Sequence, residues 1–161
     1  MTRRAKGEPW GPPAANADLW SSTLSSHTPF LLARARSVVV RACNEALRPL
    51  SLNVRTFSLL WLTTESFAPT QRQLSEFLDL DPSQVVALID DLEGQGLVQR
   101  HANPADRRAR QIVATPAGRR LFATAQGVID DVSDSAFQGL SETQRRQLTT
   151  LLGMVNRGAQ G

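Results

Sequence analysis

Two helix-start signals lie only eleven positions apart in this chain, and they restrict the segment between them to one short helix. Thr70 followed by Gln73 has the spacing of a capping box, in which each side chain satisfies a backbone N–H of the other residue. Asp81 followed by Pro82 reads as an N-cap with a first-turn proline, and Gln84 is expected to complete a second capping pair. The spacing therefore predicts a short helix, a tight turn and a second helix.

Apolar residues in both segments recur at helical spacing, which predicts that each helix buries one face. They are Leu74, Phe77 and Leu78 in the first helix, and Val85, Leu88, Ile89 and Leu92 in the second. Gly96 then ends the second helix as a glycine beyond the C-cap. Two short strands are expected at 97–100 and 111–114, joined by a segment too long for a tight turn. Two helices followed by a hairpin predict a winged helix-turn-helix.

The hairpin region is strongly basic although the whole chain has a net charge of only +3. Between Arg100 and Arg120 there are six arginines and a single acidic residue, Asp106. Such clustering is the electrostatic footprint expected of a nucleic-acid-binding surface. The alternative is a solvated charged hairpin without a partner.

The 161 residues correspond to one domain with extended arms. Residues 1–17 are rich in proline, glycine and small residues and are expected to form a disordered arm. We expect a winged module at 53–118, flanked by helices at 18–52 and 119–161. A short helix is predicted over Asp18–Ser26, and Thr28-Pro29 either starts a separate long helix to about Leu47 or kinks a single one. Further helix starts are predicted at Asn53, at Thr115-Pro116 and at Ser141 with Gln144.

The flanking helices are too apolar on one side to remain in water. Leu121, Ala125, Val128 and Val132 recur at three- and four-residue spacing, as do Leu148, Leu151, Leu152 and Val155 near the C-terminus. A second copy of the chain would cover these faces and would give a two-fold homodimer. The alternative is intramolecular packing into a monomer.

The motifs from Asp81 to Gly118 resemble the MarR family of bacterial transcription regulators. The family's wing signature, Asp-x-Arg followed by Leu-Thr-x-x-Gly, is met by Asp106, Arg108, Thr115 and Gly118, with Ala114 in place of the leucine. The likeness extends from about Thr28 to Arg157. It implies a mainly α fold in which a winged helix-turn-helix DNA-binding module carries N- and C-terminal helices that form a dimerisation region.

The resemblance implies a sequence-specific DNA-binding transcription regulator, most often a homodimeric repressor that binds an inverted-repeat operator and is relieved by a small molecule. The alternative is a winged-helix protein-interaction module without DNA binding, which is favoured by Ala87 and by the acids Asp90 and Asp91 on the recognition helix. Many members carry a polar and then a basic residue where this chain has Val86 and Ala87. This departure leaves the base-reading face poor in long hydrogen-bond donors.

Predicted DNA contacts come from three places. The recognition helix should lie in the major groove, where Gln84 can pair bidentately with adenine. The start of the preceding helix is placed for phosphates, and the wing arginines for the backbone and minor groove. Asp106 is expected to brace a wing arginine. The predicted DNA-binding residues are Thr70, Gln71, Arg72, Pro82, Ser83, Gln84, Ala87, Asp91, Arg107, Arg108 and Arg110.

Other chemistry finds little support in the sequence. The two histidines are far apart and lack zinc-ligand spacing, so neither a metal nor another cofactor is expected, and no catalytic arrangement can be argued. The family implies an effector crevice, often for small aromatic acids, to which His27, Arg34, Arg41 and Trp61 could contribute. Some MarR-like proteins sense peroxide through a cysteine that is helped by tyrosines. Because this chain has no tyrosine, Cys43 is expected to be a buried structural thiol and not a peroxide sensor. One cysteine, no apolar run of membrane length and no signal peptide indicate a cytoplasmic protein.

Overall fold

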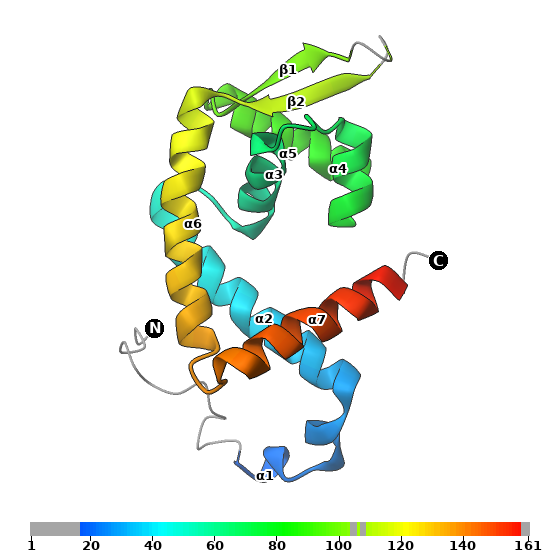
Figure 1. The fold of residues 1–161 in the computed structure, drawn as a ribbon, viewed down its shortest axis with the longest axis vertical. Helices are drawn as coiled ribbons and strands as arrows, with labels where there is room; N and C mark the ends of the chain where they lie inside the picture. Colours follow the sequence, from blue (N-terminus) through cyan, green and yellow to red (C-terminus); the bar gives the residue numbers. More distant parts are fainter. Residues whose placement is uncertain (1–16, 104–105, 107–108, 159–161) are drawn as a thin grey trace. The chain divides into compact units, whose positions relative to one another are not determined.

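The computed structural model of the protein describes residues 17–103, residue 106 and residues 109–158 (Figure 1). These residues form a mainly α fold with one antiparallel β-hairpin, as the sequence predicted. In chain order the elements are α1 (Ala17–Trp20), the 3₁₀ turn η2 (Thr23–Ser26), α2 (Thr28–Leu47), the 3₁₀ turn η3 (Arg48–Leu50), α3 (Val54–Thr64), α4 (Gln71–Leu78), α5 (Pro82–Gly94), β1 (Val98–Ala102), β2 (Arg110–Ala114), α6 (Pro116–Ala136) and α7 (Glu142–Gly158).

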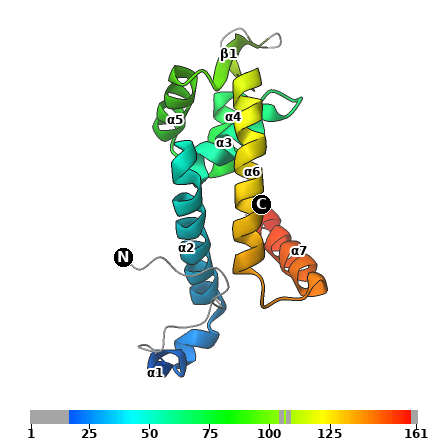
Figure 2. The ribbon, with the colours of Figure 1, turned by 90° about the vertical axis from the view of Figure 1, so that its left-hand side faces the viewer.

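The chain divides into two compact units. The central unit is Val40–Asp130, and the terminal unit comprises the described residues before and after it. In the central unit, α3 and α4 pack against β2, and α5 packs against β1, so the hairpin lies along one side of three short helices (Figures 1 and 2). This arrangement is a winged helix-turn-helix.

One hydrophobic core holds the central unit together. Its fully buried members come from each α-helix and both strands of the unit: Leu47, Leu59, Leu60, Leu74, Val85, Ile89, Leu92, Val98, Ile112 and Ala125. Because the stripe of α5 faces this core, the opposite side of that helix is left to solvent. Cys43 is also buried, and burial raises the pKa of its thiol, which disfavours the reactive thiolate.

Side-chain caps set the helix boundaries of the central unit. Asn53 and Thr70 each form a complete capping box. The Asp81 carboxylate caps α5 as predicted and accepts from the Ser83 backbone N–H (2.8 Å) and hydroxyl (2.5 Å). These Ser83 bonds hold the pKa of Asp81 below its usual value. The pairing of Asp81 with Gln84 involves the Gln84 backbone N–H, which also helps to lower the pKa of Asp81.

The turn between α4 and α5 is closed by a residue that belongs to none of the predicted capping motifs. Asp79 ends α4 in the left-handed region with φ 50°, a conformation that aspartate tolerates better than most residues. The Ser75 hydroxyl donates to the Leu80 carbonyl (2.7 Å), and the Leu80 N–H donates back to the Ser75 carbonyl (3.1 Å). This reciprocal pair fixes the angle between the two helices. Gly96, with φ 71°, ends α5 as expected.

Two large aromatic residues, Phe77 and Trp61, are exposed, although Phe77 was expected on a buried face. Phe77 is 69% exposed because α4 has only two turns and buries Leu74 and Ser75 instead. Trp61 is 41% exposed, although its ring contacts the buried Phe57 (centroids 5.7 Å apart) and Phe122 (5.4 Å).

In the terminal unit, the predicted helix starts at Thr28 and Ser141 are confirmed, but the helix predicted before Thr28 is not. A single helix over Asp18–Ser26 was expected, but α1 and η2 are separate short elements, because three serines in this stretch turn their hydroxyls back onto nearby carbonyls. Ser141 and Gln144 cap α7, as predicted. Within the described part of the chain, no helix is long and apolar enough to cross a membrane.

Candidate DNA-binding site

The solvent face of α5 carries all the recognition-helix residues predicted from the sequence. The five residues are exposed: Pro82, Ser83, Gln84, Ala87 and Asp91. Because the Ser83 hydroxyl donates to Asp81, that hydroxyl keeps only its acceptor capacity for another partner. Gln84 is therefore the one side chain among these five that offers both hydrogen-bond donors and an acceptor.

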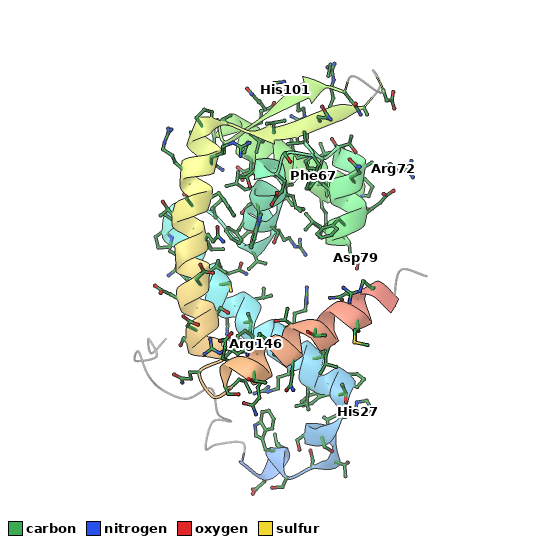
Figure 3. All side chains as sticks on the ribbon, in the orientation of Figure 1. His27, Phe67, Arg72, Asp79, His101 and Arg146 are labelled. Carbon is green, nitrogen blue, oxygen red and sulfur yellow. The ribbon has the colours of Figure 1, made fainter. Side chains whose placement is uncertain are left out.

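The start of α4 offers a second polar surface. Its first turn leaves backbone N–H groups directed outward, which suits an anion such as phosphate. Arg72 projects from this turn (Figure 3), with 87% of its side chain exposed and Glu76 accepting from its Nε at 2.7 Å. That carboxylate raises the pKa of Arg72 through a hydrogen bond and its charge, and also offsets part of its attraction for phosphate.

A polar groove of about 640 Å³ separates the start of α4 from the hairpin. Thr70, Gln71 and Arg72 line it on one side, and Arg110 and Gln111 line it on the other. The segment before α4 is also tied to β2, because the Pro69 carbonyl accepts from the Ile112 N–H at 2.9 Å and Thr70 forms a β-bridge with Gln111. The first helix of the motif and the wing are therefore one connected surface.

The strands of the hairpin pair from Val98 opposite Ala114 to Ala102 opposite Arg110. Of the predicted wing arginines, Arg110 is exposed on β2. Arg107 and Arg108 lie outside the described residues, so their roles, and the proposed bracing by Asp106, stay predictions.

The basic footprint is smaller than the arginine count suggested. Arg100 bridges β1 to α5, donating to Asp90 (2.5 Å) and to Glu93. The Arg100 backbone N–H also donates to Glu93 at 3.2 Å. Arg119 donates to the Thr64 carbonyl at 2.6 Å. Arg100 is therefore a brace between the wing and the recognition helix, and its charge is not available for DNA.

The same brace removes an argument for the alternative function. Asp90 was one of two acids that favoured a protein-interaction module, but it holds Arg100. Only Asp91 is left as an exposed acid with that interpretation.

The wing meets α6 at a close contact made by Thr115 and Gly118. The Thr115 N–H donates to the Leu97 carbonyl (2.9 Å), and its hydroxyl donates to the Gly96 carbonyl (2.7 Å). The Gly118 N–H in turn donates to the Thr115 hydroxyl at 3.1 Å. A Cβ at Gly118 would lie 2.0 Å from the Leu97 oxygen, so only glycine fits. The Thr-x-x-Gly motif is thus the joint between wing and helix.

Comparison with known proteins agrees with this geometry. Residues 52–109 match the MarR family model. A transcriptional regulator of the MarR family from Rhodococcus sp. RHA1 is 38% identical, with a TM-score of 0.78 over 83% of this chain and 95% of that one. The protein belongs to the MarR family. It is a DNA-binding transcription regulator and not an enzyme.

Two further MarR-like structures contain bound partners. CouR from Rhodococcus jostii RHA1, bound to p-coumaroyl-CoA, is 39% identical (TM-score 0.75; 83% of this chain and 94% of that one). A transcriptional repressor, CouR, bound to a 23-mer DNA duplex, is 28% identical (TM-score 0.76; 83% and 94%). The DNA duplex and the aromatic acyl-CoA are partners of those proteins.

A second cavity of the central unit is apolar. It has a volume of about 540 Å³, within the range of small-molecule pockets, and lies between α3 and α4. Its described lining is Ser58, Trp61, Leu62, Glu65, Phe67, Pro69, Gln73, Leu74, Phe77 and Leu78. We call it the apolar cleft. Glu65 is the one charged group in this lining, and the remaining polar groups are Ser58 and the amide of Gln73.

The predicted effector residues are not brought together by the described geometry. Trp61 lines the apolar cleft, but Arg41 is not among its described lining residues, although both belong to the central unit. His27, at the start of α2 (Figure 3), and Arg34 belong to the terminal unit. Arg34 lies over the Trp20 ring, 4.8 Å from its centre. Their role in ligand binding stays a prediction.

Sequence reasoning missed most of the cleft, including Phe67 in the loop before α4. The signal was the run Phe67-Ala68-Pro69, where an aromatic residue stands between two helices with no apolar stripe to join. Ala68 has φ 47°, a costly conformation for alanine that marks a tightly constrained loop. No group of three or more His, Cys, Asp or Glu able to hold a metal occurs among the residues that the structure describes.

Proposed function

We propose that the protein is a homodimeric repressor that binds an inverted-repeat operator and leaves it when a small aromatic compound occupies the apolar cleft. The observation that carries DNA binding is the exposed polar face of α5 beside the polar groove, in a member of the MarR family. Gln84 would read a base in the major groove, and Thr70, Gln71, Arg72 and the wing arginines would hold phosphates or the minor groove.

Exposed apolar side chains in the terminal unit support the homodimer. On α7, Leu151, Met154 and Val155 are 58–60% exposed, and they recur at helical spacing. Leu31 and Leu32 on α2 are also exposed, as are Leu19 and Leu24 before it. An apolar surface of this kind is costly to leave in water, and a second copy related by a two-fold axis would cover it.

Dimerisation sets the geometry of the operator. Two recognition helices related by a two-fold axis meet major grooves on one face of the duplex, so the half-site centres should lie about 10 bp apart. The operator should be an inverted repeat, with the wings reaching the minor grooves on its flanks.

The lining of the cleft supports an aromatic effector without a free carboxylate. Trp61, Phe67 and Phe77 provide aromatic surface, whereas Glu65 would repel a carboxylate and no cation occurs among the described lining residues. A neutral aromatic compound fits this lining, and so does an aromatic acid whose carboxylate has been converted to a thioester. The p-coumaroyl-CoA bound by the relative CouR has such a thioester.

DNA binding can be tested by mobility shift on the DNA upstream of the protein's own gene, with unrelated DNA as competitor. We expect a shift that specific DNA competes away at least tenfold better than random DNA. Failure to bind any duplex at low salt would instead support a protein-interaction module.

The dimer can be tested by placing charge on α7. Leu151→Glu combined with Val155→Glu should give a monomer by light scattering and abolish tight DNA binding, because both side chains are exposed and one module buries too little DNA surface. Thr149→Glu, at an exposed polar position on the opposite side of α7, is the control and should leave a dimer. A wild-type protein that is monomeric at micromolar concentration would refute the proposal.

The effector class can be tested by calorimetry with p-coumaroyl-CoA and free p-coumarate. Only the thioester should bind the wild type well and release DNA. Glu65→Gln should improve p-coumarate binding several-fold and thioester binding less, because the removed charge faces the carboxylate of the free acid but an uncharged carbonyl in the thioester, whose phosphates lie farther along the molecule. Equal effects on the two compounds would place them outside the cleft.

A further inference from the structure

The apolar cleft and the polar groove share two wall residues. Phe67 and Gln73 line both cavities, so one side of each residue meets the space between α3 and α4 and the other meets the space between α4 and the wing. Anything that fills the cleft and displaces these side chains therefore changes the groove as well.

The Gln73 side chain is hydrogen-bonded to Thr70 at the start of α4. Its Oε1 accepts from the Thr70 N–H (2.8 Å) and from the Thr70 hydroxyl (2.9 Å), and the Gln73 N–H donates to that hydroxyl at 3.3 Å. This capping box satisfies N–H groups that the first turn of a helix cannot satisfy by itself. Withdrawing the Gln73 carboxamide would leave the first turn of α4 free to fray.

Thr70 transmits the same change to the wing. It forms the β-bridge to Gln111 on β2, and the preceding carbonyl, of Pro69, accepts from the Ile112 N–H at 2.9 Å. The start of α4 and the edge of β2 are therefore held by adjoining residues, and both line the polar groove.

We propose that the Thr70–Gln73 capping box couples the two cavities: an aromatic group in the apolar cleft displaces the Gln73 carboxamide, loosens the first turn of α4 and so weakens the DNA-facing groove. This regulatory step rests on the proposed function, because it assumes that the groove holds DNA. Coupling is reciprocal, so a protein bound to DNA through an intact cap also binds the cleft ligand more weakly.

The test fills the cleft covalently and needs no natural effector. Ser58 lines the cleft and is half-buried, so Ser58→Cys labelled with N-phenylmaleimide places an aromatic ring there. The native Cys43 is buried with a raised thiol pKa, and the unsubstituted protein treated in the same way is the control for its labelling. Mass spectrometry checks the stoichiometry, and circular dichroism checks that the fold is kept.

Two substitutions at Gln73 distinguish an effect that passes through the capping box from a general effect of the bulky label in the cleft. Gln73→Glu keeps the carbonyl-type acceptor of a capping box, whereas Gln73→Leu keeps the bulk and loses the acceptor. The direct measurement is hydrogen exchange at the amides of Thr70, Gln73 and Leu74. We expect the label to accelerate this exchange at least fivefold with Gln73 or Gln73→Glu, and less than twofold with Gln73→Leu, in which exchange is already fast.

Two results would overturn the coupling role of the capping box. One is that the label accelerates exchange as much in Gln73→Leu as with Gln73, and the other is that the label leaves exchange unchanged when Gln73 is present. The DNA affinity of labelled and unlabelled forms of each variant, measured on the upstream duplex, tests the proposed function separately. Accelerated exchange with unchanged DNA affinity would uphold the coupling and refute relief of DNA binding through the cleft.

Discussion

Gly118→Ala should destabilise the protein through the joint between wing and α6. The new Cβ would lie 2.0 Å from the Leu97 oxygen and 3.0 Å from its carbon, which forces the backbones apart by more than 1 Å relative to an ordinary contact of about 3.4 Å. Such a displacement breaks the bonds from Thr115 to the carbonyls of Leu97 and Gly96, worth about 1 kcal/mol each. With roughly 1–2 kcal/mol for the clash itself, the total loss is about 3–4 kcal/mol.

Gly127→Ala is the matched control in the same helix. No heavy atom lies within 4 Å of a Cβ built there, so the substitution should stabilise α6 by about 0.5–1 kcal/mol through helix propensity alone. Urea unfolding followed by circular dichroism, at one fixed protein concentration because a dimer's stability depends on concentration, measures both variants. A Gly118→Ala protein within 0.5 kcal/mol of wild type would refute the assignment of this glycine to a close backbone contact.

Three further substitutions test the DNA-facing parts. Arg108→Ala should weaken binding to every duplex and reduce the slope of log affinity against log salt by about one unit, since one phosphate contact is lost; an unchanged slope would remove Arg108 from the interface. Gln84→Ala should cost about 1–3 kcal/mol on the operator and little on random DNA, and equal losses would make Gln84 a positioning contact. Arg100→Ala should lower the free energy of unfolding by about 1–2 kcal/mol, because it removes the ion pairs that hold the wing to the recognition helix. Arg146→Ala, which removes an exposed ion pair, is the control and should cost less than about 0.5 kcal/mol. Similar losses for the two arginines would contradict the bracing role.

The local parts of the fold were predictable because they depend on neighbours in sequence. The Thr70–Gln73 capping box, the Asp81-Pro82 start of α5 and the Gly96 stop all formed as predicted, since each needs only a side chain and backbone groups two to four residues away. The winged architecture followed from their spacing, and the flanking helices followed from their start signals and from the helical spacing of their apolar residues.

The predictions that failed depend on contacts between different elements of the fold. Phe77 fits an apolar stripe, but an eight-residue helix buries few positions, and which ones it buries depends on where α3 lies. The arginine count overstated the basic surface because Arg100 pairs with Asp90 and Glu93, which lie ten and seven residues earlier on another element. The apolar cleft was missed for the same reason, since its walls are α3, α4 and the loop that joins them.

Footprinting of the protein on its upstream DNA, combined with native mass spectrometry of the complex, tests whether the protein binds its operator as a two-fold dimer. A dimeric MarR-family repressor should give two chains per duplex and protect one inverted repeat whose half-site centres are about 10 bp apart. The protection should disappear for Leu151→Glu with Val155→Glu, although every proposed DNA contact is kept. One chain per duplex, or protection without two-fold symmetry, would contradict the account.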